Sequence, residues 1–139
     1  MVNVRYHESE YEEVFIQRLT EVGWSYIPGC ELADRRITDA IYEPDLMAYL
    51  QAKYGGRGLT ALDYQQMIAN LRNTSGVNDY LTARAVHKLV CHDGYDYQPL
   101  DGSEAIKVRY IDFDADDVRT ANIFRCINQF ELVEGEENR

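Results

Sequence analysis

The sequence has no long apolar segment, few cysteines and a deficit of basic residues, and each absence excludes a class of protein. No stretch approaches the roughly 20 apolar residues that a membrane-spanning helix needs, and residues 1–8 lack the apolar segment of a signal peptide. The three cysteines have no paired spacing, which is typical of free thiols in a reducing compartment. We therefore expect a cytoplasmic protein without membrane association.

Basic residues number 14 against 24 acidic ones, and the formal net charge is −10. Because neutralisation of phosphates dominates nucleic-acid affinity, this balance argues against a strong DNA-binding surface on the chain by itself. The 11 tyrosines are interpreted as filling half-buried positions, since a base-stacking platform would need interleaved basic residues. At 139 residues and 45% apolar composition, we expect one domain, residues 1–139, with its own core.

Helical periodicity dominates the first two thirds of the chain. In residues 8–23 one helix face carries Tyr11, Phe15, Leu19 and Val22, and Gly23 is the predicted stop. Residues 31–42 fit no single pattern. Further helices are predicted from Pro44 to Tyr54, after a Thr60–Asp63 capping box as far as Asn73, and over residues 78–92.

Alternation of apolar and polar residues predicts strands in the last third. The expected strands are short ones at 24–27 and 95–97 and longer ones at 106–113 and 123–133. Helices followed by antiparallel strands indicate the α+β class. The last strand would leave an exposed edge, so we expect an incomplete sheet and self-association of chains through that edge.

Most candidate chemical motifs fail when their spacing is tested. A calcium loop starting at Asp112 would need Gly at its sixth position and Glu at its twelfth, where Asp117 and Ile123 stand, so residues 112–117 are interpreted as a solvated turn. Residues 55–58, Gly-Gly-Arg-Gly, lack the Lys-Ser/Thr of a phosphate loop and are interpreted as a turn between helices. Residues 91–93, Cys-His-Asp, are interpreted as a helix-end cluster, because sequence neighbours rarely form a catalytic or metal site.

Two polar features remain candidates for a structural or functional role. Asn128 and Gln129 interrupt an apolar strand and should be hydrogen-bonded there, which predicts bridging amides. Glu12 is the candidate metal ligand, since carboxylates hold Mg²⁺ near phosphate oxygens. The alternative is a surface glutamate favoured by the helix dipole.

Three segments are similar to the N-terminal part of the restriction (R, HsdR) subunit of type I restriction–modification enzymes. Residues 12–24, Glu-Glu-Val-Phe-Ile-Gln-Arg-Leu-Thr-Glu-Val-Gly-Trp, resemble the first helix of that family. Residues 108–113, Val-Arg-Tyr-Ile-Asp-Phe, resemble its V-x-L-I-D-F strand, with Tyr110 in place of Leu. Residues 122–133, which include Asn-Ile-Phe and Asn-Gln-Phe-Glu-Leu-Val, resemble its N-x-F…N-Q-F-x-V segment.

The resemblance implies an incomplete restriction-endonuclease-like domain of the PD-(D/E)xK type. It implies catalytic residues beyond Arg139, because no Glu-x-Lys occurs in the chain. The parent enzyme would cleave DNA with Mg²⁺ and ATP, together with modification and specificity subunits, while this fragment alone would be inactive and bind no cofactor.

Two alternatives from other classes remain. The net charge of −10 is also typical of an acidic protein-interaction module, for instance a DNA-mimic antirestriction protein. A small thiol enzyme using Cys91 is the second alternative, and it would require a depressed thiol pKa.

Overall fold

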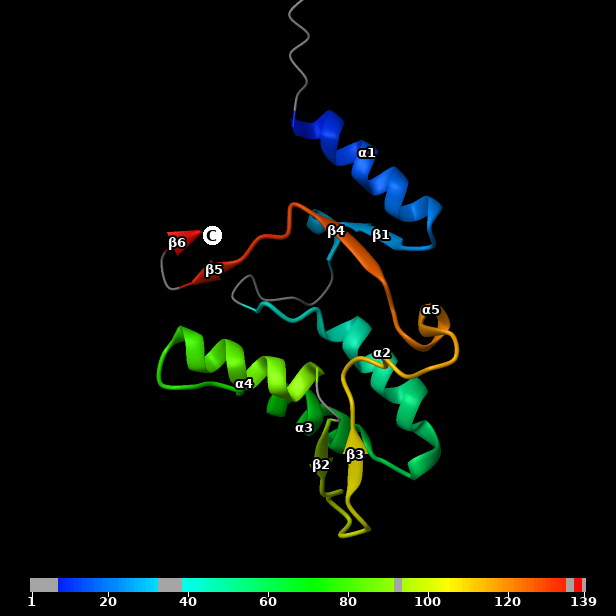
Figure 1. Ribbon diagram of the computed structural model, residues 1–139, viewed down its shortest axis with the longest axis vertical. Coiled ribbons are helices and arrows are strands. Elements are labelled where there is room, and N and C mark those ends of the chain that lie inside the picture. The colour runs from blue at the N-terminus through cyan, green and yellow to red at the C-terminus, as the bar shows by residue number, and fades with distance from the viewer. Residues whose placement is uncertain (1–7, 33–38, 92–93, 135–136, 139) are drawn as a thin grey trace, which may run out of the picture. The chain divides into compact units, whose positions relative to one another are not determined.

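The computed structural model describes residues 8–32, 39–91, 94–134 and 137–138. It belongs to the α+β class, as the sequence predicts, and divides into two compact units (Figure 1). Unit 1 comprises the described residues of Met1–Ala40 and Ile123–Arg139, and unit 2 comprises Ile41–Asn122. Within the described ranges, no helix is both long and apolar enough to cross a membrane.

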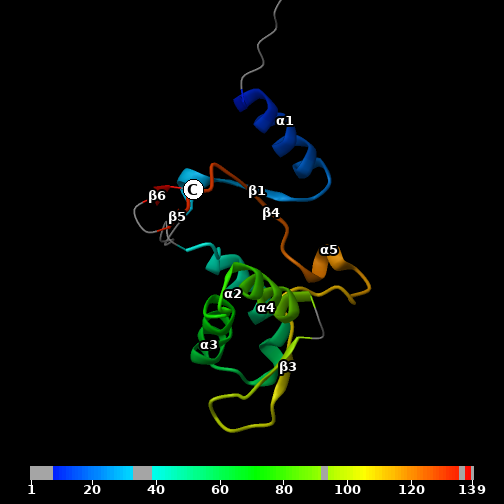
Figure 2. The ribbon, with the colours of Figure 1, turned by 60° about the vertical axis from the view of Figure 1, so that its left-hand side comes forward.

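Unit 1 is built from one helix and short strands at the two ends of the chain. Its elements are α1 (Glu8–Glu21), β1 (Ser25–Pro28), the 3-10 turn η1 (Gly29–Glu31), β4 (Arg125–Asn128), β5 (Val133–Glu134) and β6 (Glu137–Asn138). Figures 1 and 2 both show α1 beside β1 and β4. The rings of Trp24 and Phe124 lie 5.3 Å apart next to these strands.

The end of α1 is set by local hydrogen bonds, as the sequence predicts. Gly23 has a φ of +101°, the left-handed region that glycine adopts without a steric penalty. The Gly23 N–H donates to the Thr20 carbonyl and the Trp24 N–H donates to the Leu19 carbonyl. This pair of bonds is the Schellman arrangement, which satisfies carbonyls of the last helical turn and directs the chain into β1.

The pairing of β1 with β4 is parallel, with Ser25 opposite Arg125 and Pro28 opposite Asn128. The prediction of antiparallel strands is therefore wrong for β4, although β2–β3 and β5–β6 are antiparallel. A parallel pair needs a long crossover, whereas a hairpin enforces antiparallel pairing. Unit 2 supplies that crossover, and no local signal in either strand reveals it.

Unit 2 packs three helices against a hairpin. Its elements are α2 (Glu43–Tyr54), η2 (Gly55–Arg57), α3 (Ala61–Arg72), α4 (Asp79–Cys91), β2 (Tyr95–Tyr97), β3 (Ile106–Val108) and α5 (Val118–Ala121) (Figure 2). The predicted turn at residues 55–58 is confirmed, as is the Thr60–Asp63 capping box. The buried core consists of Tyr49, Leu50, Tyr54, Tyr64, Met67, Ile68, Tyr97, Val108 and Tyr110.

The tyrosines of this core are buried by their rings and hydrogen-bonded by their hydroxyls. Tyr110 donates to the Met67 carbonyl at 2.5 Å, and Tyr97 donates to Asp63 at 2.8 Å. Burial raises the pKa of Tyr49, Tyr97 and Tyr110, so these phenols keep their protons and act as donors. The tyrosines thus close the core of unit 2 more completely than the half-buried role we predicted.

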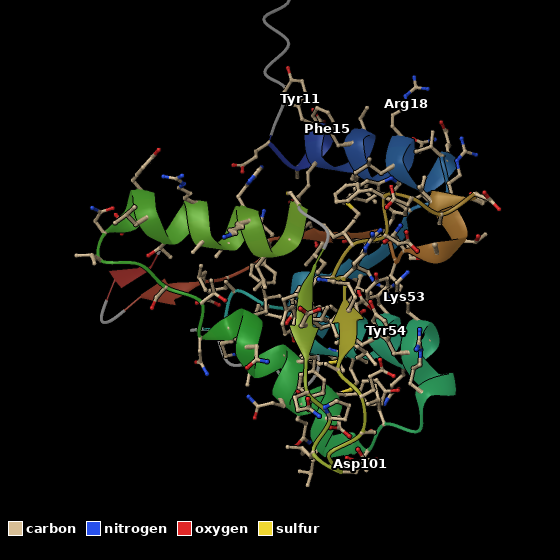
Figure 3. All side chains as sticks on the ribbon, turned by 60° about the horizontal axis from the view of Figure 1, so that its bottom comes forward. Tyr11, Phe15, Arg18, Lys53, Tyr54 and Asp101 are labelled. Atoms are coloured by element: carbon tan, nitrogen blue, oxygen red, sulfur yellow. The ribbon has the colours of Figure 1, made fainter. Side chains whose placement is uncertain are left out.

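Strand β3 ends at Val108, well before the predicted end at residue 113, because side chains of α2 take the next backbone groups. The Arg109 N–H donates to the Tyr54 hydroxyl at 2.7 Å, and the Tyr49 hydroxyl donates to the Arg109 carbonyl at 2.9 Å. Figure 3 shows Tyr54 next to this strand. Because the two hydroxyls satisfy both the N–H and the carbonyl of Arg109, this residue does not need hydrogen bonds to a neighbouring strand.

We expect Tyr54→Phe to lower the free energy of unfolding by about 1–2 kcal/mol, because the Arg109 N–H loses its acceptor inside the protein. Urea denaturation followed by circular dichroism measures the change. Tyr80→Phe is the matched control, since Tyr80 is exposed on α4 and should lose almost nothing. Equal midpoints for the Tyr54 variant and the parent chain would contradict this account of the end of β3.

The predicted strand over residues 123–133 is also interrupted. Strand β4 covers Arg125–Asn128, and Gln129 then adopts a left-handed φ of 49°. Pairing resumes only in β5, at Val133–Glu134. The interruption separates the amides of Asn128 and Gln129, which turn to different partners in unit 1.

Candidate functional site

The candidate metal ligand Glu12 lies in unit 1, on the side of α1 that packs against the strands. Glu12, Ile16 and Leu19 recur at helical spacing and are each half-buried. The Gln129 side-chain amide donates to the Glu12 carboxylate, with 3.0 Å between Nε2 and Oε1. The site therefore joins a helix near the start of the chain to the end of β4.

The end of β4 is held by a close backbone approach at Gly29. The Gly29 N–H donates to the Asn128 side-chain oxygen at 3.1 Å. A Cβ atom at residue 29 would stand 2.2 Å from the Asn128 carbonyl oxygen and 2.5 Å from that of Gln129. Only glycine fits this approach, and the prediction that Asn128 and Gln129 act as bridging amides is confirmed.

Tyr26 is the titratable side chain of β1, and its pKa depends on the charge of this site. Burial raises its pKa, and the negative charge of Glu12 raises it further. Tyr26 is also the register partner of Cys126 on β4. The phenol therefore stays neutral at physiological pH and supplies no charge to the site.

The residues described in unit 1 do not fit a complete magnesium site. Mg²⁺ takes an octahedral set of oxygen ligands, commonly including one or two carboxylates. Glu12 already accepts a hydrogen bond from Gln129, and among the described residues of the whole chain no three His, Cys, Asp or Glu side chains are grouped to hold a metal ion. We therefore derive no catalytic step through a metal on this chain.

Three of the four aspartates in residues 112–117 have separate partners, which agrees with the interpretation of this segment as a turn and not as a calcium loop. Asp112 accepts from Lys53, and this bond lowers the pKa of Asp112. Asp114 pairs with Arg109, and Asp117 accepts from the Arg119 N–H at the start of α5. The turn is thus tied to α2 through Lys53 and is less solvated at Asp112 than we predicted.

The cysteine cluster of residues 91–93 is only partly described. Cys91 is the exposed last residue of α4, as a helix-end cluster requires. His92 and Asp93 lie outside the described residues. The thiol-enzyme alternative stays an untested prediction.

Asp63 is the polar residue whose importance sequence reasoning missed. It is 2% exposed at the start of α3. Beyond its capping partner Thr60, it accepts from the Tyr97 hydroxyl and, at 2.9 Å, from the Leu100 N–H. The capping box is visible in the sequence, but the contact with the turn after β2 depends on a fold that brings residues more than 30 positions apart together.

Comparison of the chain with protein-family models, with curated proteins and with solved structures finds no match. The geometry in unit 1 therefore stands by itself. It consists of a carboxylate on α1, an amide at a left-handed position after β4, and a parallel strand pair fixed by Gly29.

Proposed function

We propose that this chain is the N-terminal part of the nuclease domain of a type I restriction R subunit. The hydrogen bond between Gln129 and Glu12 carries the proposal, because it joins two of the segments on which the resemblance rests, 117 residues apart in sequence. A chance likeness of two short segments gives no reason for them to meet. A shared fold, in which the helix and the strand support one site, would give such a reason.

In this role the chain would act as scaffold. Helix α1 and the parallel pair β1–β4 would support the sheet of a restriction-endonuclease-like domain, with Glu12 held at the end of β4 by Gln129. The resemblance assigns phosphodiester hydrolysis with Mg²⁺ to residues beyond Arg139, and ATP-driven translocation to a motor that follows them. Site recognition would belong to the specificity subunit.

The proposal predicts that residues 1–139 alone do not cleave DNA. Incubation of supercoiled plasmid with the purified chain, Mg²⁺ and ATP should leave the plasmid intact, because the described residues do not complete a metal site. Nicking that survives further purification and disappears with chelator would contradict the scaffold role.

The reading frame beyond codon 139 tests the identity directly. We expect it to continue into Pro-Asp and then Glu-x-Lys. The continued chain, supplied with modification and specificity subunits, should cleave unmodified DNA, and alanine at the Glu of Glu-x-Lys should abolish cleavage. A stop codon at position 140 would overturn the proposal.

A stop codon would instead favour the acidic interaction module. The observation behind this second candidate is the dense acidity of α1, where Glu8, Glu10, Glu13 and Glu21 are all exposed. A DNA mimic should bind a DNA-handling protein and be displaced by duplex DNA. Failure of DNA to compete would exclude mimicry.

A further inference from the structure

Every residue that the structure describes as buried lies in unit 2. These residues are the hydrophobic ones of the core and Asp63, and all of them fall between Tyr49 and Tyr110. In unit 1, the residues whose burial is described are half-buried or exposed. Because burial of apolar side chains supplies most of the free energy that favours folding, unit 1 is the less stable of the two units.

The contacts inside unit 1 are few and partly open to solvent. The β1–β4 sheet has two strands of four residues, and two strands alone are marginally stable in water. Helix α1 has 14 residues and no buried side chain, and an isolated helix of that length is marginal as well. The Glu12–Gln129 hydrogen bond that joins α1 to the end of β4 is exposed. Since each part depends on the others, we expect the helix and the strand pair to lose order together.

The pairing of β1 with β4 also depends on unit 2, which lies between the two strands in sequence. Gly29 and Asn128, which are hydrogen-bonded at the end of the pair, are 99 positions apart. Bringing together the ends of an unfolded segment of that length costs conformational entropy. Once unit 2 has folded, its own contacts fix most of that segment, and the entropic cost of pairing β1 with β4 falls.

The end of unit 2 that leads into β4 is anchored by Asn122. The Asn122 side-chain oxygen accepts from the Asp112 N–H at 2.8 Å, and its amide donates to the carbonyls of Asp112 and Val118 at 2.8 and 2.9 Å. The Asp112 carboxylate in turn pairs with Lys53 in the last turn of α2 (Figure 3). Asn122 is thus tied to a helix of the unit 2 core, and β4 begins shortly after it, at Arg125.

We infer that unit 1 is an order–disorder element of this fold. Helix α1 and strands β1 and β4 lose their structure together while unit 2 stays folded, whereas unit 1 does not form without unit 2. A partner that binds only one of the two forms would shift the population between them, so the order of unit 1 is a property that binding can control. The inference goes beyond the proposed nuclease role and does not depend on it.

Hydrogen exchange of the full chain, measured by mass spectrometry, tests this inference segment by segment. Backbone amides of α1, β1 and β4 should share one level of protection. They should exchange at least about tenfold faster than those of α3, which carries the buried Tyr64, Met67 and Ile68. Low concentrations of urea should accelerate exchange in unit 1, because opening of a whole unit exposes surface and fluctuation of single bonds does not.

Gly29→Ala should raise the exchange rates of α1, β1 and β4 together by about tenfold or more, because the added Cβ would stand 2.2 Å from the Asn128 carbonyl oxygen. The exchange rates of α3 should change less than about twofold, since unit 2 stays folded. Gly56→Ala is the matched control, because no atom lies within 4 Å of its added Cβ, and unit 1 should not respond to it.

Asn122→Ala tests whether the anchor in unit 2 supports unit 1. It should raise the exchange rates of β1 and β4 by about threefold or more, although the changed residue belongs to unit 2. Asn78→Ala is the matched control, because the Asn78 side chain also accepts from a backbone N–H of unit 2, that of Leu81 at 2.9 Å, but does so at the start of α4. This control should raise exchange in α4 and leave β1 and β4 as in the parent chain.

Four results would overturn the inference. The first is equal protection of the amides of unit 1 and α3. The second is a Gly29→Ala effect of the same size in α3, because the chain would then open as one cooperative body. The third is exchange in unit 1 that neither urea nor Gly29→Ala changes, since single bonds would then open and not the unit. The fourth is an equal response of β4 to Asn122→Ala and Asn78→Ala.

Discussion

Replacing Gly29 with alanine is expected to separate β1 from β4 and to dismantle the Glu12–Gln129 site. The added methyl group would stand 2.2 Å from the Asn128 carbonyl oxygen and 2.5 Å from the Gln129 carbonyl oxygen. Both are backbone atoms, so no side-chain rotation relieves the overlap. The strands must move apart at this end, and we expect the free energy of unfolding to fall by about 3 kcal/mol, the upper end of the usual cost of overpacking.

Trp24 makes this loss measurable in unit 1 specifically. It is the only tryptophan of the chain, and its ring lies 5.3 Å from that of Phe124, next to the strand pair. In urea, Trp24 fluorescence of the Gly29→Ala variant should change at a much lower midpoint than in the parent chain. Gly56→Ala is the control, because no atom lies within 4 Å of its added Cβ, and its Trp24 midpoint should not move. Equal midpoints for Gly29→Ala and the parent would refute the close approach of β1 and β4.

The second large effect is expected at Asp63. One carboxylate oxygen accepts from the Tyr97 hydroxyl and the Leu100 N–H, and the other accepts from the Thr60 N–H and hydroxyl. Asp63→Asn turns one acceptor oxygen into a donor amide that faces two donors. The thermal midpoint should fall by roughly 5–10 °C.

Circular dichroism, which reports the helices, measures this midpoint. Asp96→Asn is the matched control, because it removes a carboxylate from an exposed pair with Lys107 on the same hairpin. Exposed pairs contribute little, so its midpoint should shift by far less. An Asp63 variant that melts with the control would show that the four bonds are not important for stability.

The pH dependence of the Asp63 effect follows from its pKa. Hydrogen bonds from the Leu100 and Thr60 N–H groups lower the pKa of Asp63 from 3.8 to about 2, against the opposing effect of burial. A group with a depressed pKa in the folded state stabilises above its unfolded pKa, and this stabilisation is lost as pH falls through the folded value. The midpoint gap between the parent and Asp63→Asn should be constant above about pH 5 and shrink between about pH 4 and pH 2. A gap that widens in acid would contradict the direction of the shift.

The sequence predicts those features that depend on residues within one turn of each other. Gly23 ends α1 because a left-handed residue and two backbone bonds suffice, and the Thr60–Asp63 capping box starts α3 for the same local reason. The helices expected from periodicity are present near their predicted bounds. Glu12 could likewise be selected from sequence as a carboxylate on a helix.

The strands follow the sequence less closely, because their ends depend on distant partners. β3 stops at Val108 because hydroxyls of Tyr49 and Tyr54 satisfy the Arg109 backbone, and these tyrosines lie on α2. An alternating pattern through residue 113 cannot reveal that competition. Asp63 illustrates the same limit, since its contact with Leu100 requires the packed hairpin.

By itself, the sequence determines the α+β class, the positions of the helices, the acidity of α1 and the need of Asn128 and Gln129 for hydrogen-bond partners. The tertiary structure alone decides that β1 and β4 run parallel, that Gln129 meets Glu12, and that the apolar residues of α1 divide between a packed side and an exposed stripe. The physical reason is the distance along the sequence over which each kind of interaction acts. Caps, dipoles and periodicity act over one or two turns, whereas strand pairing and burial depend on which distant segments the folded chain brings into contact.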